Sequence, residues 1–323
     1  MKVSIAINNI NDYCKERIKN LKNKFNNIET NNIEDNKERD FSDSDIIIGG
    51  KLSKTELNEA KKLKAFFLHY TGLNNLPLQE LEDRNIVVTN THGKSHIVAE
   101  KALSLTLATM GRLVEYHLLL KNEGKWNNWK NWEDDFWNSL YDKKCAIFGM
   151  GSIGKNIINL LKPFNCKIVG LERDRTKGLA DIYAKDIVDM AEKCDVFFVS
   201  VPLTDDTKGI INKKILSKMK GSFLINIARG CIVDEKDLYE ALKDGTLAGA
   251  GIDAWYNYPK EYDKPTFPSQ YPIYKFENVV VSPHSASHAK ETINSYYEDI
   301  FDQLEYYLEN NQFQKKLDLN KYI

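Results

Sequence analysis

The sequence predicts an α/β protein in which a doubly wound parallel sheet is inserted into a smaller α/β unit. Short apolar runs alternate with helical patterns along most of the 323 residues, a length that allows two domains of ordinary size. One apolar run, residues 144–148, leads into three glycines in GxGxxG spacing and then into a helical pattern. We expect residues 1–118 and 286–323 to form the smaller unit, and residues 119–285 to form the inserted one.

The smaller unit contains four apolar runs with the near-continuous hydrophobicity of parallel strands that are covered on both faces. These strands are expected at residues 2–7, 45–48, 65–68 and 85–88. The polar segment 22–43 is expected to be a solvated surface element. One periodic helix from residue 97 to about 121 is expected to bridge the units, and a helix over residues 289–310 to cross back to the first unit.

In the inserted unit, strands and helices alternate regularly after the glycine turn. Strands are expected at residues 167–171, 195–201, 222–227, 248–252 and 278–282, and helices at residues 180–193, 213–219 and 234–243. Asp234 is the expected N-cap of the last of these helices. Ligands of such sheets bind beside the carboxyl ends of the strands, so functional residues are expected in the loops there.

The glycine turn predicts a dinucleotide site. Gly149 allows a sharp turn, Gly151 allows the backbone to approach a pyrophosphate, and Gly154 lets the helix press onto the strand. The helix N-terminus then favours an anion. The motif alone is weak evidence, but the next strand ends at Glu172, about twenty residues on, where an acid meets the ribose hydroxyls of NAD. Together these features favour a Rossmann NAD-binding domain over a chance glycine-rich turn.

Charge and cysteine usage narrow the class of protein. Lys plus Arg number 45 and Asp plus Glu number 46, a net charge of −1, so neither nucleic acid nor an acidic membrane is an expected partner. No apolar stretch approaches the roughly 18 residues of a membrane span, which predicts a soluble, cytoplasmic protein. The five widely spaced cysteines predict reduced, packed thiols, with no disulfide framework and no metal site.

Four of the five tryptophans lie between Gly124 and Trp137, among polar residues. Stacking of nucleic-acid bases is one interpretation, but no basic groove accompanies the rings. A packed linker, or a surface that is buried against a second subunit, is the favoured interpretation.

Three strand ends of the inserted sheet carry residue types suited to reducing a ketone beside a carboxylate. They are residues 228–230 with Arg229, 251–255 with Asp253, and 282–287 with His284. An arginine fork holds carboxylate and carbonyl oxygens, and an imidazole gives and regains a proton near neutral pH. Taken singly, a surface ion pair and a turn histidine are the simpler interpretations. Their position at strand ends of one dinucleotide fold favours catalysis.

Between residues 66 and 287 the sequence resembles the D-isomer-specific 2-hydroxyacid dehydrogenases, which include glycerate, phosphoglycerate, lactate and formate dehydrogenases and glyoxylate and hydroxypyruvate reductases. The resemblance is carried by Val88-Thr-Asn90, Val98-Ala-Glu100, Gly149 to Gly154, Leu161 to Phe164, Pro202-Leu-Thr204, Asn226 to Gly230, Val233-Asp234, Asp253 and Pro283-His284. It implies a homodimer whose subunits join a Rossmann domain to a flavodoxin-like substrate (catalytic) domain, with the active site in the cleft between them.

The resemblance also implies roles for single residues. Arg229 matches the arginine that binds the substrate carboxylate and carbonyl, His284 the acid/base, and Asp253 the aspartate that holds the nicotinamide carboxamide. Substrate contacts are expected from Thr71, Gly72, Leu73, Lys94 and Arg229. Cofactor contacts are expected from Gly149, Gly151, Ser152, Ile153, Gly154, Glu172, Arg173, Val201, Pro202, Thr204, Thr207, Ala228, Asp253, His284 and Ser287.

Two positions depart from the family pattern. The family usually has an acid hydrogen-bonded to the catalytic histidine where this chain has Tyr258. A neutral phenol orients the ring but does not raise its pKa as a carboxylate does, so reduction is expected to be fastest at lower pH than in relatives with the acid. The alternative is that Glu261 or Asp263 folds back to supply the charge. Lys94, where relatives often have asparagine, is expected either to bind an acidic or phosphorylated substrate or to face solvent.

The sequence therefore predicts an NAD-dependent D-2-hydroxyacid dehydrogenase or 2-keto acid reductase of glycerate, phosphoglycerate or glyoxylate/hydroxypyruvate type. Hydride is expected to pass between the nicotinamide and substrate C2. Glu172 favours NAD, whereas Arg173 and Arg175 leave NADP open. The alternatives are a formate dehydrogenase-like enzyme and an NAD(H)-binding regulatory protein on the same scaffold.

Overall fold

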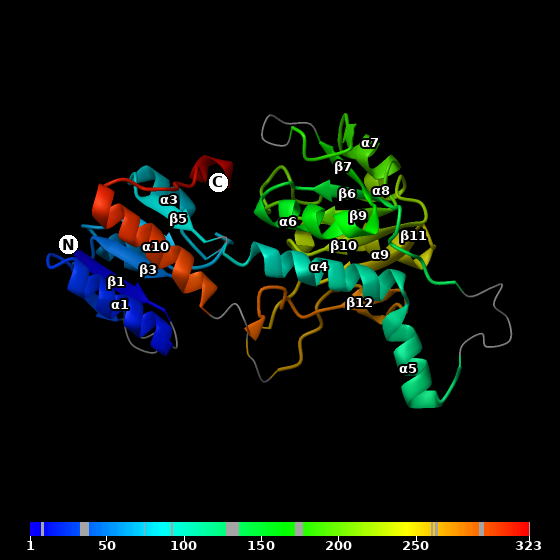
Figure 1. The fold of residues 1–323 in the computed structure, drawn as a ribbon, viewed down its shortest axis with the longest axis horizontal. Coiled ribbons are helices and arrows are strands. Elements are labelled where there is room, and N and C mark those ends of the chain that lie inside the picture. The colour runs from blue at the N-terminus through cyan, green and yellow to red at the C-terminus, as the bar shows by residue number, and fades with distance from the viewer. Residues whose placement is uncertain are drawn as a thin grey trace. The chain divides into compact units, whose positions relative to one another are not determined.

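The computed structural model describes residues 1–7, 10–32, 39–73, 75–91, 93–126, 136–171, 177–259, 261, 264–290 and 294–322. The chain divides into two compact units, Met1–Lys94 with His288–Ile323, and Ser95–Ser287. The first unit therefore ends at Lys94, whereas the sequence pattern placed its end near residue 118. The difference arises because helix α4 (Ser95–Met110) packs against helix α6 (Ser152–Leu161) of the second unit. Figure 1 labels these elements.

The first unit is built on a five-stranded parallel sheet with the order β2-β1-β3-β4-β5, the order of flavodoxin-like sheets. Its strands are β1 (Lys2–Ala6), β2 (Glu29–Asn32), β3 (Ile46–Gly49), β4 (Ala65–Leu68) and β5 (Val87–Asn90). Its helices are α1 (Asp12–Lys24), α2 (Lys54–Glu59), α3 (Leu78–Asp83) and α10 (Ser295–Asn310). Ile46 and Ile48 pack into the core beside α1 and α10, and Ile47 packs into the core on the opposite face. Both faces of the sheet are therefore covered, as the continuous apolar runs predict.

Strand β2 lies in the polar segment that was expected to be a solvated surface element. It pairs with β1 from Glu29, opposite Lys2, to Asn32, opposite Ile5. An edge strand needs backbone partners on one side and tolerates polar side chains, so neither hydrophobicity nor period indicated it. The segment is at the surface, but it forms a strand that the sequence analysis did not predict.

The single helix expected from residue 97 to about 121 is two helices. After α4 the chain breaks at Gly111 and Arg112, whose φ is +50°, and α5 then spans Leu113–Glu123. A side chain at Gly111 would lie 2.6 Å from the carbonyl oxygen of Leu107. The two helices also differ in burial, because α4 contributes six buried residues to the second unit and α5 contributes none. The periodic apolar pattern therefore does not mark one continuous buried face.

The second unit is a seven-stranded parallel sheet with the order β12-β11-β10-β9-β6-β7-β8, which confirms the doubly wound Rossmann prediction. Its strands are β6 (Lys144–Phe148), β7 (Lys167–Leu171), β8 (Ile182–Ala184), β9 (Val196–Val199), β10 (Ser222–Asn226), β11 (Leu247–Ile252) and β12 (Val279–Val281). Besides α4 and α6, its helices include α7 (Ile187–Glu192), α8 (Lys213–Leu216) and α9 (Glu235–Lys243).

Two expected helices have different bounds in the structure. The segment 180–193 holds strand β8 followed by the shorter α7, whose N-cap Asp186 accepts a hydrogen bond from the Asp189 N–H. Helix α10 begins at Ser295 rather than at residue 289, and residues 291–293 lie outside the described chain. Asp234 caps α9 by accepting from the Asp237 N–H, as predicted.

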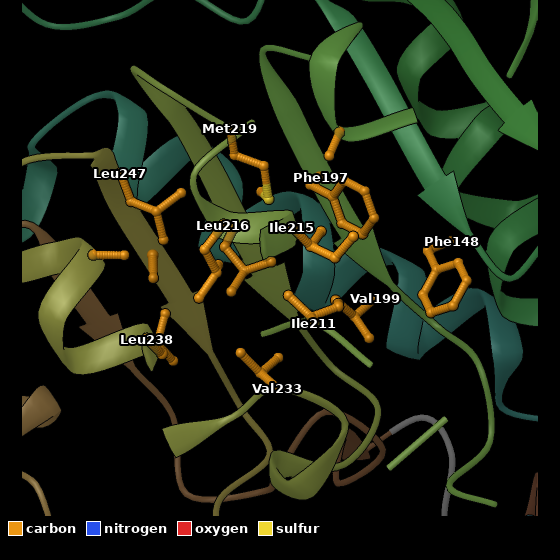
Figure 2. Close-up of a cluster of buried hydrophobic side chains, with 14 of the residues drawn as sticks. Phe148, Phe197, Val199, Ile211, Ile215, Leu216, Met219, Val233, Leu238 and Leu247 are labelled. Atoms are coloured by element: carbon orange, nitrogen blue, oxygen red, sulfur yellow. The ribbon is translucent and has the colours of Figure 1, made fainter. Parts of the chain in front are cut away.

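One large apolar cluster holds the second unit together on one face of its sheet. Figure 2 shows Phe148 from β6 and Phe197 and Val199 from β9 together with Ile211, Ile215 and Leu216 from the segment around α8. Phe197 is fully buried there. This packing fixes the strands whose carboxyl ends carry the candidate site.

We expect Phe197→Ala to lower the free energy of unfolding of the second unit by about 3–5 kcal/mol, because it leaves a cavity in this cluster. Phe267, which is 69% exposed, is the matched control, and Phe267→Ala should change the free energy by no more than about 0.5 kcal/mol. Denaturant unfolding followed by circular dichroism measures both. Equal losses for the two variants would contradict the assigned core.

Candidate active site

The glycine turn between β6 and α6 combines close backbone packing with one open position. Gly149 has φ +109°, and a side chain there would lie 2.7 Å from the backbone of Ser200 and Val201. A side chain at Gly154 would collide with the carbonyl oxygen of Gly149. At Gly151, by contrast, an added side chain would meet nothing within 4 Å. The turn thus packs closely against the backbone at Gly149 and Gly154, and leaves open space beside Gly151.

Helix α6 begins directly after this open position. Gly151 is its N-cap and supplies no side-chain hydrogen bond, so Ser152 and Ile153 lie in a first turn whose N–H groups are not capped by that residue. Uncapped N–H groups and the helix dipole favour an anion. The turn therefore fits the pyrophosphate of a dinucleotide. Glu172 and Arg173, expected at the ribose, lie outside the described residues.

The loop after β9 is braced by two threonines. The Thr204 N–H donates to Thr207 Oγ1 at 2.8 Å, and that hydroxyl donates to the carbonyl of Pro202 at 2.7 Å. Val201 lies at the start of this loop, beside Gly149. Because β9 pairs with β6, the braced loop adjoins the glycine turn.

Arg229 follows β10 and is held by the last residue of that strand. The side-chain oxygen of Asn226 accepts from the Ala228 N–H at 3.1 Å, and its nitrogen donates to the Arg229 carbonyl at 3.1 Å. A side chain at Gly230 would collide with the backbone of Trp255, so the loops after β10 and β11 are in direct contact. Burial lowers the pKa of the Arg229 guanidinium from its ordinary value.

Asp253 at the end of β11 is fully buried, and its carboxylate holds the turn that follows β12. One of its oxygens accepts from the Ser285 N–H at 2.9 Å and the other from the Ala286 N–H at 3.0 Å. His284, just before these two amides, has φ +54°. Successive N–H groups after a left-handed residue form a concave anion site, and here the anion is a side chain of the protein. Ser287 follows this turn directly.

Tyr258 links this turn to the loop after β11. Its hydroxyl lies 2.7 Å from His284 Nδ1 and accepts a hydrogen bond from the Trp255 N–H at 3.1 Å. Burial raises the pKa of Tyr258 above its ordinary value, while the Trp255 N–H and the charge of Arg229 oppose that rise. The phenol is therefore neutral at physiological pH and shares one neighbourhood with His284 and Arg229.

The alternative that an acid folds back to His284 concerns Glu261 and Asp263. Glu261 pairs with Lys264 at 2.8 Å, and Asp263 lies outside the described residues. Tyr258 is the partner that the structure gives to the histidine ring at Nδ1.

The remaining candidate residues belong to the first unit. Thr71 donates through its hydroxyl to the Thr91 carbonyl at 2.9 Å, at the start of the turn that continues through Gly72 and Leu73. Lys94 is only 7% exposed, so the expectation of a solvent-facing lysine is wrong. Its amine lies over the ring of Tyr296, 2.9 Å from the ring centroid, and burial lowers its pKa to about 8.

Asn226 and Trp255 lie in stretches that the sequence pattern singled out, but no structural role was predicted for either side chain. Asn226 braces its own loop through Ala228 and Arg229, whereas the Trp255 indole donates from Nε1 to the Ser282 carbonyl at 2.8 Å and so joins two loops that are distant in sequence. Residue spacing alone does not indicate these bonds. The described part of the chain contains no group of three or more His, Cys, Asp or Glu residues able to hold a metal ion.

Known proteins match this chain along most of its length. Residues 103–286 match the NAD binding domain of the D-isomer specific 2-hydroxyacid dehydrogenases. The glyoxylate reductase of Thermofilum pendens is 32% identical over 77% of this chain and 74% of its own length. The formate dehydrogenase of Neurospora crassa is 33% identical over 71% of this chain and 64% of its own length.

A solved structure extends the similarity to the whole fold. The NADPH-dependent glyoxylate/hydroxypyruvate reductase from Sinorhizobium meliloti, in complex with NADP and malonate, superposes with a TM-score of 0.78 and 28% identity, covering 99% of this chain and 98% of that one. This chain therefore belongs to the D-isomer specific 2-hydroxyacid dehydrogenase family of oxidoreductases, whose hydroxyacid dehydrogenases and keto acid reductases act on CH–OH groups with NAD or NADP.

Proposed function

We propose that this protein reduces small 2-keto acids such as glyoxylate and hydroxypyruvate to D-2-hydroxy acids. The observation that carries the proposal is the 2.7 Å contact between Tyr258 and His284, in the neighbourhood of Arg229. An imidazole and a partly buried guanidinium that share the neighbour Tyr258 are suited to proton transfer at a carbonyl next to a carboxylate. The similarity to glyoxylate reductases supports the same substrate class.

Bound NAD(P)H would supply the hydride for substrate C2. The glycine turn and the uncapped start of α6 would hold the pyrophosphate, and the loop of Thr204 and Thr207 would border the cofactor. Asp253 remains our proposed contact for the nicotinamide carboxamide, because each of its oxygens accepts one N–H and has further acceptor capacity.

In the proposed mechanism, Arg229 receives the substrate carboxylate and carbonyl in its planar fork. The backbone N–H groups of the Thr71–Leu73 turn are our further proposed contact for the substrate carboxylate. Lys94 supplies a second cation and so favours a substrate with a further acidic group, including a phosphorylated one. Burial of Lys94 and partial burial of Arg229 strengthen their contacts with an anion, because the local dielectric is lower than that of water.

His284 donates a proton from Nε2 to the carbonyl oxygen as the hydride reaches carbon. Nδ1 keeps its own proton, which points at the Tyr258 oxygen during this step. That oxygen then accepts from both Nδ1 and the Trp255 N–H, which is within the capacity of a phenol. In the reverse direction the same Nε2 removes the hydroxyl proton of a D-2-hydroxy acid.

The experiment that tests this function is NADH and NADPH oxidation with glyoxylate, hydroxypyruvate, pyruvate and phenylpyruvate. We expect turnover of at least one acid, and Arg229→Lys should lower kcat/KM for it about a hundredfold, because a lysine lacks the planar fork. Arg17→Lys is the control, since Arg17 pairs with Asp302 in the first unit.

Two alternatives give different results in that panel. A formate dehydrogenase-like enzyme would reduce NAD with formate and leave every keto acid unchanged. An NAD(H)-binding regulatory protein would bind NADH without any turnover. Either result would contradict the proposed reduction.

The pH dependence tests the role of Tyr258. Reduction needs protonated His284, so the rate should fall as pH rises through the pKa of that ring. The phenol of Tyr258 stays neutral and places no negative charge beside the ring, whereas Tyr258→Glu would place one there and should move the fall to higher pH by about 1–2 units.

Tyr258→Phe removes the hydroxyl that orients the ring and should lower kcat about tenfold, the effect of roughly 1.4 kcal/mol. Profiles of kcat/KM against pH for wild type, Tyr258→Glu and Tyr258→Phe test whether Tyr258 orients His284. Identical profiles in wild type and Tyr258→Glu, or full activity in Tyr258→Phe, would rule out the pairing.

We further propose that the protein is a homodimer that pairs through α5. This helix has no buried residue among its described side chains and exposes Leu113, Val114, Leu118 and Leu120. Trp126, three residues after the end of this helix, and Trp137 are 67% and 59% exposed, and Trp129 and Trp132 lie outside the described residues. Apolar surface of this kind is stabilised by cover from a second subunit.

Leu113→Lys combined with Leu118→Lys should convert the dimer to a monomer, because charges in an apolar interface lose their hydration. Light scattering after size-exclusion chromatography should give twice the 37.2 kDa of the chain for wild type and the single mass for the variant. Phe267→Lys, at an exposed ring outside α5, should leave the mass unchanged. A monomeric wild type would refute the proposed interface.

We also propose a cytoplasmic location. All five cysteines are free thiols and four of them are buried, which suits a reducing compartment. No described helix has the length and hydropathy needed to cross a membrane.

A further inference from the structure

The Thr71–Leu73 turn is hydrogen-bonded to the end of strand β5. The side-chain nitrogen of Asn90 donates to the Thr71 carbonyl at 2.8 Å, and the Thr71 hydroxyl donates to the Thr91 carbonyl at 2.9 Å. Asn90 is 3% exposed and Thr91 is fully buried. The position of the turn is therefore set by two adjacent residues that are shielded from solvent.

The peptide group that joins Asn90 to Thr91 is itself fixed by two side chains. Its carbonyl oxygen accepts from Gln303 Nε2 at 3.2 Å and from Lys315 Nζ at 3.1 Å. Because a peptide group is planar, holding this carbonyl also holds the backbone N–H of Thr91 and the direction of both residues. Gln303 belongs to α10, whereas Lys315 comes from the segment after it.

Both donors lie beside the carboxylate of Asp299. Gln303 Nε2 also donates to Asp299 Oδ1 at 3.1 Å, and the Thr91 hydroxyl donates to Asp299 Oδ2. Burial lowers the pKa of the Lys315 amine, and the charge of Asp299 opposes that shift. A charged donor gives a stronger hydrogen bond than a neutral one, so Lys315 contributes more than Gln303 to holding the carbonyl.

The C-terminal segment is held to the first unit by contacts other than the lysine amine. The Leu317 N–H donates to the Val88 carbonyl at 2.9 Å, and Leu319 is 1% exposed in the core beside α3. In Figure 1 this segment, drawn in red, runs next to β5 and α3. The C-terminal segment therefore has other contacts that dock it. The Lys315 amine instead donates to the peptide between Asn90 and Thr91, from which the Thr71–Leu73 turn is held.

We propose that Lys315 is a positioning residue for the carboxylate-binding turn, acting through the peptide between Asn90 and Thr91. It sets the affinity for the keto acid without touching the substrate. This inference rests on the proposed function, because it assumes that the N–H groups of residues 71–73 receive the carboxylate.

The kinetic test uses Lys315→Met, which keeps a long apolar side chain and removes the donor. We expect KM for glyoxylate to rise about five- to tenfold, with kcat and the Kd of NADH near wild type, because only substrate placement changes. Lys315→Arg keeps a charged donor and should restore most of the affinity. Lys316→Met is the control, since that neighbour is exposed and lies over the ring of Phe313.

A second measurement does not depend on turnover. Amide hydrogen exchange at Gly72 and Leu73 should be faster in Lys315→Met than in wild type and unchanged in Lys316→Met. If wild type reduces no acid, the proposed function fails, and exchange at these two amides still decides the role of Lys315. Unchanged exchange, or an unchanged KM with only a lower melting temperature, would overturn the inference.

Discussion

A buried carboxylate holds the backbone on which the proposed acid/base histidine stands. Asp253 accepts two successive N–H groups just after His284, whose φ is +54°. A left-handed residue with a side chain costs roughly 1–2 kcal/mol, and such a conformation persists where its surroundings determine it. The two amide hydrogen bonds to Asp253 hold the backbone of His284 in this conformation. The loops after β11 and β12 therefore act as one element, although Asp253 and Ser285 are 32 positions apart in the sequence.

Tyr258 makes this element chemically unusual within the family pattern. A carboxylate at its position would stabilise a charged imidazole by Coulomb attraction, whereas a phenol offers only a hydrogen bond. Burial keeps that phenol neutral, and the Trp255 N–H fixes its oxygen next to Nδ1. The ring is thus oriented by a hydrogen bond, and its charged form gains no Coulomb attraction from this partner. In the proposed mechanism the difference concerns the pH at which reduction is fastest rather than the chemistry of the step.

The sequence predicted the parts of the structure that depend on local pattern. The GxGxxG spacing, the apolar strands and the N-cap Asp234 are local signals, and the structure has the corresponding elements. Strand β2 was not predicted because this polar edge strand has no hydrophobic pattern. The helix break at Arg112 was not predicted because the apolar period continues across it. Distant contacts had no signal at all. Neither the bonds of Asp253 to the β12 turn nor the bond of Lys315 to Asn90 follows from residue spacing.

The most direct measurement is nitrogen NMR of the His284 ring, assigned by comparing wild type with His284→Gln among the six histidines. We expect the Nδ1 chemical shift to be that of a hydrogen-bonded nitrogen. Tyr258→Phe should remove this hydrogen-bond shift at Nδ1 and change the Nε2 shift little. Identical ring signals in wild type and Tyr258→Phe would mean that the phenol does not hold the histidine, and the proposed mechanism would fail with it.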